Sequence, residues 1–191
     1  MKNGTNVKEK IINVTTELIQ QGSGNIADIT TREIAQRANV GVGLINYHFQ
    51  SKDNLITICV QRIIKQVVIG FSPDAKAYQG DKERLTDWAA RVFGFLFENP
   101  AISRISILGD LFDYSMDSNS VRTQKGFGLA MKKEVGESDK RMLSFILTSA
   151  MQTAFLSSKA SVELLGYDFN EPSDRKAFIT RLVAVLFDGI Q

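Results

Sequence analysis

Apolar residues recur along this chain with the spacing that places them on one face of an α-helix. In the first such stretch, the apolar stripe consists of Val7, Ile11, Val14 and Leu18. The alternation of apolar and polar residues that is typical of strands is scarce, and the 191 residues include three prolines. Similar helical stripes continue to the end of the sequence. We therefore predict an all-α fold with about nine helices.

The region between residues 30 and 50 contains two short helical segments. The sequence Thr30-Thr-Arg-Glu33 is a capping box. In this motif the Thr30 hydroxyl accepts from the Glu33 amide and the Glu33 side chain reaches back, which predicts a helix over about 31–38. Asn39-Val-Gly41 is a tight break before a second short helix, over about 42–48. Two short helices joined by a tight turn form a helix-turn-helix unit.

The pattern of caps and breaks also predicts the layout of the remaining chain. Ser51 caps a helix over roughly 52–70, and residues 71–80 indicate a linker. Further helices are expected over about 81–98, 100–116, 119–136 and 138–158, and from Pro172 onward. We therefore predict two domains, residues 1–65 with the motif at about 30–49, and residues 66–191.

Composition indicates a soluble protein with a slightly basic first third. Net charge is +2 for the whole chain; residues 1–65 carry eight Lys/Arg and five Asp/Glu, and residues 66–191 carry fifteen and sixteen. This imbalance weakly favours a polyanionic partner for the first part. The polar N-terminus and the lack of a long apolar stretch favour a cytoplasmic protein without a membrane partner. Cys59 stands in an apolar run, and we expect it to be buried.

The second short helix has an inward and an outward face. Ile45 and Phe49, four residues apart, are expected to face the core. The outward residues are then Val42, Gly43, Asn46 and Tyr47. A helix N-terminus attracts phosphate through its free amides, an asparagine amide pairs with adenine in the major groove, and tyrosine hydroxyls bond phosphate. This face therefore has the chemistry of a DNA contact.

Three motifs in this region carry a resemblance to a known family. They are Thr30-Thr-Arg-Glu-Ile-Ala, then Val40-x-x-Gly-x-Ile, then Tyr47-His-Phe-x-Ser-Lys-Asp-x-Leu55. In this order and at this spacing they resemble the TetR family of bacterial transcriptional regulators. The resemblance covers roughly residues 7–60, which is about a third of the chain.

The resemblance implies which side chains reach DNA. Thr31 and Arg32 would do so from the start of the first short helix. In the second, Val42, Gly43 and Leu44 would lie against bases or phosphates, Asn46 would enter the major groove, and Tyr47 and His48 would lie near the backbone. Lys52 would hold a phosphate.

Three positions depart from the family's common pattern. Gly41 stands where Ser or Thr often caps the recognition helix, so this cap is weaker. Leu44 replaces a frequent Thr, and Asn46 replaces a frequent Tyr. The operator sequence therefore cannot be copied from relatives.

The second domain is rich in aromatic residues that belong either to the core or to a ligand pocket. A pocket, which the resemblance favours, would take a hydrophobic or amphipathic molecule because few charges fall on the inner faces. The candidate lining residues are Trp88, Phe93, Phe97, Phe112, Tyr114, Phe127 and Phe145. Asp110 and Asp113 are either solvated or able to receive a cationic ligand.

The last two predicted helices have the character of a dimer surface. Each carries an apolar stripe, and the helix over 138–158 adds the small residues Ser149, Ala150, Thr153 and Ala154, which allow close packing. Two such helices from each subunit would form a four-helix bundle, as the resemblance also implies. A two-fold dimer would bind a near-palindromic operator.

The sequence argues against an enzyme. It lacks the His-Glu-x-x-His, P-loop and dinucleotide-binding motifs. One histidine and one cysteine make a transition-metal site improbable, so we expect no metal and no cofactor.

The leading hypothesis is a homodimeric DNA-binding regulator, in particular a repressor that a small molecule releases from its operator. One alternative is a DNA-binding regulator without a small-molecule effector. Another is a helical enzyme or scaffold with a vestigial helix-turn-helix.

Overall fold

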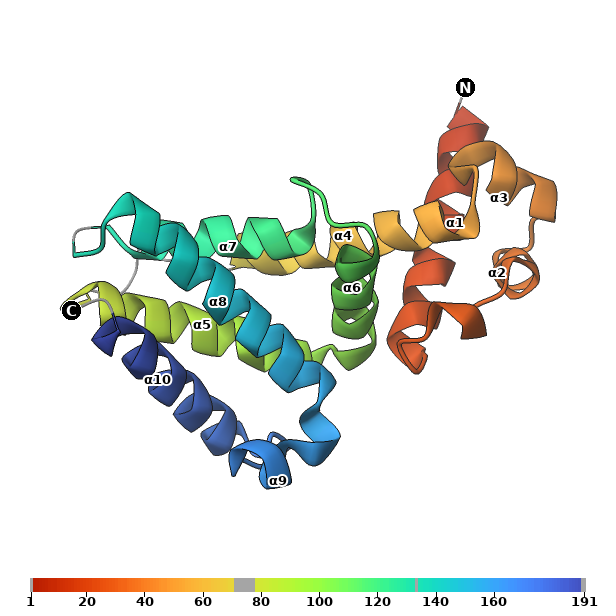
Figure 1. Cartoon of the computed structure of the whole chain (residues 1–191). Helices are drawn as coiled ribbons and strands as arrows, with labels where there is room; N and C mark the ends of the chain where they lie inside the picture. Colours follow the sequence, from red (N-terminus) through yellow and green to blue (C-terminus); the bar gives the residue numbers. More distant parts are fainter. Residues whose placement is uncertain (1, 71–77, 133, 190–191) are drawn as a thin grey trace. The chain divides into compact units, whose positions relative to one another are not determined.

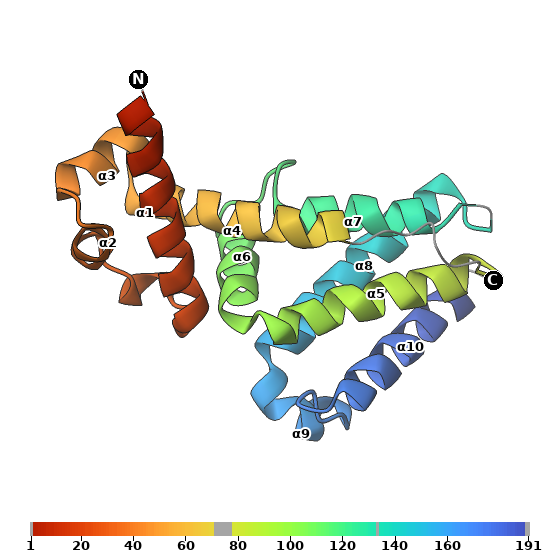
Figure 2. The same cartoon turned by 180° about the vertical axis from the view of Figure 1, so that it is seen from behind.

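The computed structural model describes residues 2–70, 78–132 and 134–189, and these residues form ten α-helices and no strand (Figures 1 and 2). The all-α prediction is therefore confirmed. The chain divides into two compact units. The N-terminal unit comprises residues 1–73 and 99–109, and the C-terminal unit comprises residues 74–98 and 110–191. No described helix is long and apolar enough to cross a membrane.

The N-terminal unit is built around the two short helices that the sequence predicted. Its elements are α1 (Lys2–Gln21), η1 (Ile26–Asp28), α2 (Thr31–Ala38), α3 (Val42–Phe49), α4 (Lys52–Gly70) and most of α6 (Pro100–Phe112). Thr30 caps α2, since its hydroxyl accepts from the Glu33 amide at 3.1 Å. The carboxylate of Glu33 does not complete the capping box; it pairs with Arg37 one turn further along, at 3.1 Å.

One apolar cluster holds the N-terminal unit together. Its fully buried members include Ile11, Ile19, Ile34, Ile45, Leu55 and Cys59. Ile102 and Ile105 of α6 belong to the same cluster although they lie far along the chain. The sequence analysis placed the domain boundary between residues 65 and 66, which lie inside α4, and it assigned α6 to the second domain. In the structure α6 packs with the first unit up to residue 109.

The C-terminal unit is a bundle of helices around an aromatic cluster. Its helices are α5 (Asp81–Glu98), α7 (Asn119–Ala130), α8 (Glu137–Leu156), the short α9 (Ser161–Leu165) and α10 (Pro172–Asp188), with η3 (Ser158–Ala160) before α9. α10 packs along α5, and α7 packs along α8 (Figures 1 and 2). The ring centroids of Phe93 on α5 and Phe178 on α10 lie 5.4 Å apart, and the ring of Phe169 contacts both.

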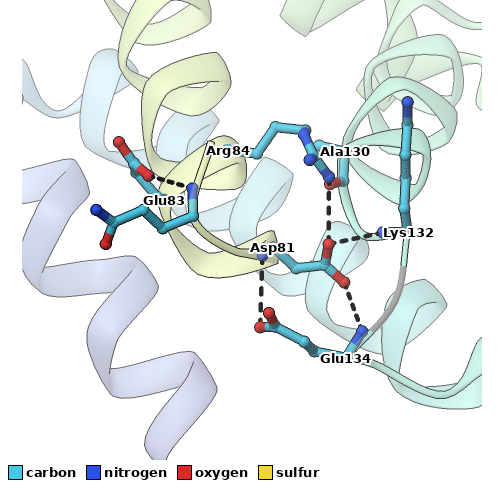
Figure 3. Close-up of polar contacts among 7 residues, drawn as sticks. Asp81, Glu83, Arg84, Ala130, Lys132 and Glu134 are labelled. Atoms are coloured by element: carbon cyan, nitrogen blue, oxygen red, sulfur yellow. Dashed lines mark hydrogen bonds and ion pairs between the residues drawn. The ribbon is translucent and has the colours of Figure 1, made fainter. Parts of the chain in front are cut away.

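A buried carboxylate joins α5 to the segment after α7. Asp81, 1% exposed, accepts from the backbone amides of Lys132 and Glu134 at 2.9 and 2.8 Å (Figure 3). The Arg84 guanidinium donates to Asp81 at 3.2 Å and to the Ala130 carbonyl at 3.0 Å. These bonds fix the end of α7 against the start of α5.

Helix boundaries differ from the prediction where such long-range bonds act. α6 ends at Phe112 rather than near 116, and Asp110 then accepts from the amide and the hydroxyl of Ser120 at 2.7 and 2.6 Å. Asp110 is therefore engaged by α7 rather than merely solvated. α7 ends at Ala130 rather than near 136, because Asp81 takes the amides that follow. Most of the predicted linker, residues 71–77, lies outside the described residues.

Candidate nucleic-acid interface

α3 turns one face to the core and the other to solvent, as its spacing predicted. Ile45 and Phe49 are buried. The exposed residues are Val42, Gly43, Leu44, Asn46 and Tyr47, and Tyr47 is 79% exposed. His48 is partly buried and packs edge-on against the Tyr47 ring, with ring centroids 5.0 Å apart. Seven of the nine predicted DNA contacts lie on α3 or directly after it, and the structure brings six of them together on this one helix.

The N-terminus of α3 is open. Gly41 stands at the cap position in extended conformation, φ −73° and ψ 144°, and no side chain caps the helix there. The first amides of a helix have no carbonyl partner within the helix. The amides of Val42 and Gly43 are therefore available to an anion, and the helix dipole favours negative charge at the same place.

Two backbone turns fix α3 relative to its neighbours. Asn39 ends α2 in the left-handed region, φ 49°, and its amide is bonded to the carbonyls of α2. Gln50 ends α3 with φ 66°, and its amide bonds the Asn46 carbonyl at 2.9 Å. Residues other than Gly adopt positive φ infrequently, and Asn is among the residues that tolerate it best. These turns set the direction of α3.

The two arginines of α2 differ in whether they form an ion pair within the described part of the chain. Arg37 pairs with Glu33 and donates to Gln21 at 3.3 Å. Arg32 lies at the start of α2, is exposed, and has no ion pair within the described part of the chain. Thr31, beside it, is partly exposed. Arg32 is thus the arginine of α2 that can meet a phosphate or a base edge.

Lys52 is held by the protein itself. Its Nζ donates to the Ile26 carbonyl at 2.9 Å, which ties the start of α4 to η1. An ammonium group has three donors, so the bond to Ile26 leaves two for a phosphate. The predicted phosphate contact by Lys52 stays a prediction, and the structure adds a positioning role.

Lys8 was missed by the sequence analysis and borders the same surface. α1 and α3 lie side by side, and the Lys8 Nζ is 5.8 Å from the centre of the Phe49 ring (Figures 1 and 2). The side chain of Lys8 is exposed. Its neighbour Glu9 is already taken by Arg62, at 2.7 and 3.0 Å, and this bond lowers the pKa of Glu9. No local pattern links position 8 to position 49, so this contact leaves no signal in the sequence.

The predicted ligand-lining aromatics do not share one environment. Phe93 and Phe127 are buried, whereas Phe112, Tyr114 and Phe145 are 94%, 50% and 53% exposed. Trp88 and Phe97 are partly buried. The structure brings Phe93 and Phe97 together, with ring centroids 5.1 Å apart, and leaves the three exposed residues outside that cluster.

α8 carries an exposed apolar stripe. Met142, Phe145 and Ile146 are 60%, 53% and 37% exposed, and Thr153 continues their face two turns later. Ala154, which was predicted for a dimer contact, is buried within the unit. On α10, Val185 is exposed.

The described residues offer no cluster of three or more His, Cys, Asp or Glu side chains that could hold a metal ion. Burial raises the pKa of Cys59 to about 11, so this thiol is protonated at neutral pH. The exposed face of α3 thus has the chemistry to contact an anion and base edges through amides, an asparagine and a tyrosine.

Comparison with known proteins agrees with this geometry. Residues 11–57 match the family model described as bacterial regulatory proteins, tetR family. No curated protein matches the chain. The crystal structure of a TetR transcriptional regulator from Rhodococcus sp. RHA1 superposes with a TM-score of 0.69 at 15% identity, covering 100% of both chains.

A TetR-like transcriptional regulator from the same organism gives a TM-score of 0.64 at 16% identity, covering 96% of each chain. At these identities the two solved proteins show a shared fold. The match of residues 11–57 covers α2, α3 and the start of α4, which are the elements that build the surface described above. The helix-turn-helix segment of this chain thus matches the tetR family of bacterial regulatory proteins, and the chain as a whole shares its fold with two solved TetR regulators.

Proposed function

We propose that this protein is a cytoplasmic, sequence-specific DNA-binding transcriptional regulator that acts as a homodimer and represses its target. The observation that carries the proposal is the exposed face of α3. It combines an uncapped helix N-terminus, a glycine, an asparagine and a largely exposed tyrosine. These groups support a DNA contact, because a tyrosine hydroxyl and free amides are suited to phosphate and an asparagine amide is suited to a base edge.

The proposed contacts fall into two groups. The phosphate backbone would be bound by Tyr47, His48 and Lys52, and base edges would be met by Val42, Gly43, Leu44 and Asn46. Thr31 and Arg32 would reach the DNA from the start of α2, at a phosphate or a base edge. Phosphate contacts set register and affinity, and base contacts set sequence. The free amides of α3 would add to the first group.

The proposed dimer forms through α8 and α10. The exposed stripe on α8 supports it, since three large apolar side chains on one helix face are costly to leave in water. Two copies of α3, related by a two-fold axis, would read a near-palindromic operator.

The proposed effector is a small hydrophobic or amphipathic molecule bound in the C-terminal unit. Trp88 and Phe97 support this, because both are aromatic residues of α5 that are only partly buried. An effector releases DNA when it binds the non-binding conformation more tightly than the binding one.

The test is selection of duplex DNA from a random pool, followed by affinity measurements at several salt concentrations. We expect one enriched near-palindromic sequence and an affinity that falls as salt rises. Tyr47→Ala should weaken binding roughly tenfold, since hydrogen bonds to charged groups are worth about 1.5–3 kcal/mol.

Tyr114→Ala is the matched control, because Tyr114 is also exposed but lies in the C-terminal unit. Its affinity for the selected DNA should equal that of the wild type. Absence of salt-sensitive, sequence-selective binding by the wild-type protein would refute the proposal.

A further inference from the structure

The residues of α3 limit which base pairs it can read. The helix sequence Val-Gly-Leu-Ile-Asn-Tyr-His-Phe, residues 42–49, contains no Arg, Lys, Asp or Glu. Arg and Lys are the commonest readers of guanine, through O6 and N7, and Asp and Glu accept from cytosine N4. α3 therefore lacks the usual partners of a G·C pair.

The exposed arc of α3 offers an amide and two apolar side chains instead. At about 100° per residue, the order around the helix is Val42, Asn46, Gly43, Tyr47, Leu44, with Ile45 and Phe49 on the opposite side. Val42 and Leu44 flank the arc, and their exposures, 40% and 41%, agree with this position. Both can contact a thymine methyl group, which is the apolar feature of the major groove.

Gly43 lies at the centre of the arc and faces open space. A Cβ added there would meet no atom within 4 Å, so the backbone fold does not require glycine at this position. Its φ is also ordinary for an L-residue, because the positive-φ glycines are Gly24 and Gly166. The absence of a side chain lets the helix backbone come closer to a surface, which brings the short side chains of Val42 and Asn46 within reach of base edges.

Asn46 has the donor and acceptor that adenine requires. Its side chain is exposed, and in the described structure the side-chain amide makes no hydrogen bond. Its backbone carbonyl accepts from the backbone amide of Gln50. An asparagine side chain pairs with adenine through N6 and N7. It is free to do so here without breaking a contact within the protein.

We infer that the part of each operator half-site beneath α3 consists of A·T pairs, with Asn46 on an adenine and Val42 or Leu44 against thymine methyl groups. This inference rests on the proposed DNA-binding function and adds the bases that are read. Arg32 of α2 and Lys8 of α1 lie outside α3, so any G·C preference falls to the flanks of that A·T segment.

The experiment uses the selected operator and chemically altered copies of it. Replacing the contacted adenine by 7-deazaadenine removes N7, and replacing thymine by uracil removes the methyl group. We expect each change to weaken wild-type binding, by about tenfold for the deaza base. Asn46→Ala should bind the normal operator as weakly as the wild type binds the deaza copy, and should not weaken further on that copy.

Asn46→Arg supplies a positive test. It should move the preference at one position of each half-site from A·T to G·C in a repeated selection. Val42→Ala should lose most of the difference between thymine and uracil, and Leu44→Ala is tested in parallel. Because these side chains are exposed, the thermal unfolding of each variant should match the wild type, which separates loss of contact from loss of folding.

Failure of this inference can be distinguished from failure of the proposed function. If the wild-type protein selects no sequence, the proposed function fails. If it selects a near-palindrome with G·C pairs at the centre of each half-site, or if the deaza and uracil copies bind as well as the normal operator, the proposed function stands and this inference is overturned.

Discussion

A single buried carboxylate, that of Asp81, fixes where α5 and the end of α7 meet. It lies at the first position of α5, where negative charge is favoured by the helix dipole, and it is saturated by backbone amides and by Arg84. The two amides that it binds lie 51 and 53 residues away in sequence, so neither its burial nor its role follows from local pattern. A sequence reading sees only an acidic residue at a helix start.

Asp81→Ala should lower the free energy of unfolding by about 3 kcal/mol, because it leaves two backbone amides without their acceptor and removes the ion-pair partner of a partly buried guanidinium. Urea denaturation followed by circular dichroism measures this value. Glu137→Ala is the control: that carboxylate also begins a helix, but it is 77% exposed and pairs with Lys140 on the surface. A loss below about 1 kcal/mol is expected there. Equal losses for the two variants would contradict the assignment.

Cys59 illustrates a residue whose environment the sequence did predict. It stands in an apolar run, it is fully buried, and its thiol donates to the Ile12 carbonyl at 3.6 Å. Burial raises its pKa to about 11, above the ordinary thiol value, since the thiolate would lose its hydration. The protonated form is therefore dominant throughout the neutral range.

The native protein should react with iodoacetamide at pH 8 at least roughly a hundredfold more slowly than the urea-unfolded protein, since only the thiolate is the nucleophile. Mass spectrometry of timed samples measures both rates. Rapid alkylation of the folded chain would show that the thiol is accessible and that the pKa assignment is wrong.

At the level of helices, the start and end signals differ in how local they are. α2, α4 and α5 begin and end where caps and breaks place them, because each signal lies within a few residues of the boundary. α7 stops early, because Asp81 binds the amides of Lys132 and Glu134, which a longer helix would have used. α6 also stops early, at Phe112, and its Asp110 binds the amide of Ser120 at the start of α7. α9 was not predicted, since five residues are too few to establish a period.

The features of the candidate site also divide into those that local sequence predicts and those that depend on contacts between helices. Which residues of α3 face outward follows from its period, and burial confirms it. The contact of Lys8 with Phe49 and the bond from Lys52 to Ile26 depend on how α1, α3 and α4 pack, and no local rule contains that information.

Lys8 provides a test of the α1–α3 pairing. Because its ammonium lies beside the end of α3, Lys8→Gln should reduce the slope of log affinity against log salt by about 1 on any duplex DNA. Filter binding or fluorescence anisotropy over a salt series measures this slope. Lys8→Arg should retain it.

Lys10→Gln is the matched control for Lys8→Gln. Lys10 is exposed on the same helix, but two residues correspond to a rotation of about 200°, so it faces away from α3. Its salt slope should equal that of the wild type. Equal slopes for both variants, or a changed slope for Lys10→Gln alone, would contradict the placement.

For the molecule as a whole, the exposed stripe of α8 predicts the oligomeric state. Phe145→Glu should convert the proposed dimer into a monomer, because it places a charge within an apolar contact, and light scattering after gel filtration measures the mass. Phe112→Glu is the control, since Phe112 is more exposed but lies at the end of α6. A wild-type protein that is monomeric, or a Phe145→Glu variant that stays dimeric, would contradict the dimer through α8.

The return of α6 into the N-terminal unit has a consequence for how the protein is made. Ile102 and Ile105 complete a core that otherwise consists of residues before position 64, and Gly24 lies close to Ala101, where an added Cβ would be 3.1 Å from the Ala101 Cα. A ribosome that has finished α3 must therefore add more than fifty further residues, which takes several seconds at about 5–20 residues per second, before the unit can close. During that time the apolar surface that Ile102 and Ile105 later cover stays exposed, and a chain cut after α4 would carry the whole of α3 on an incomplete core.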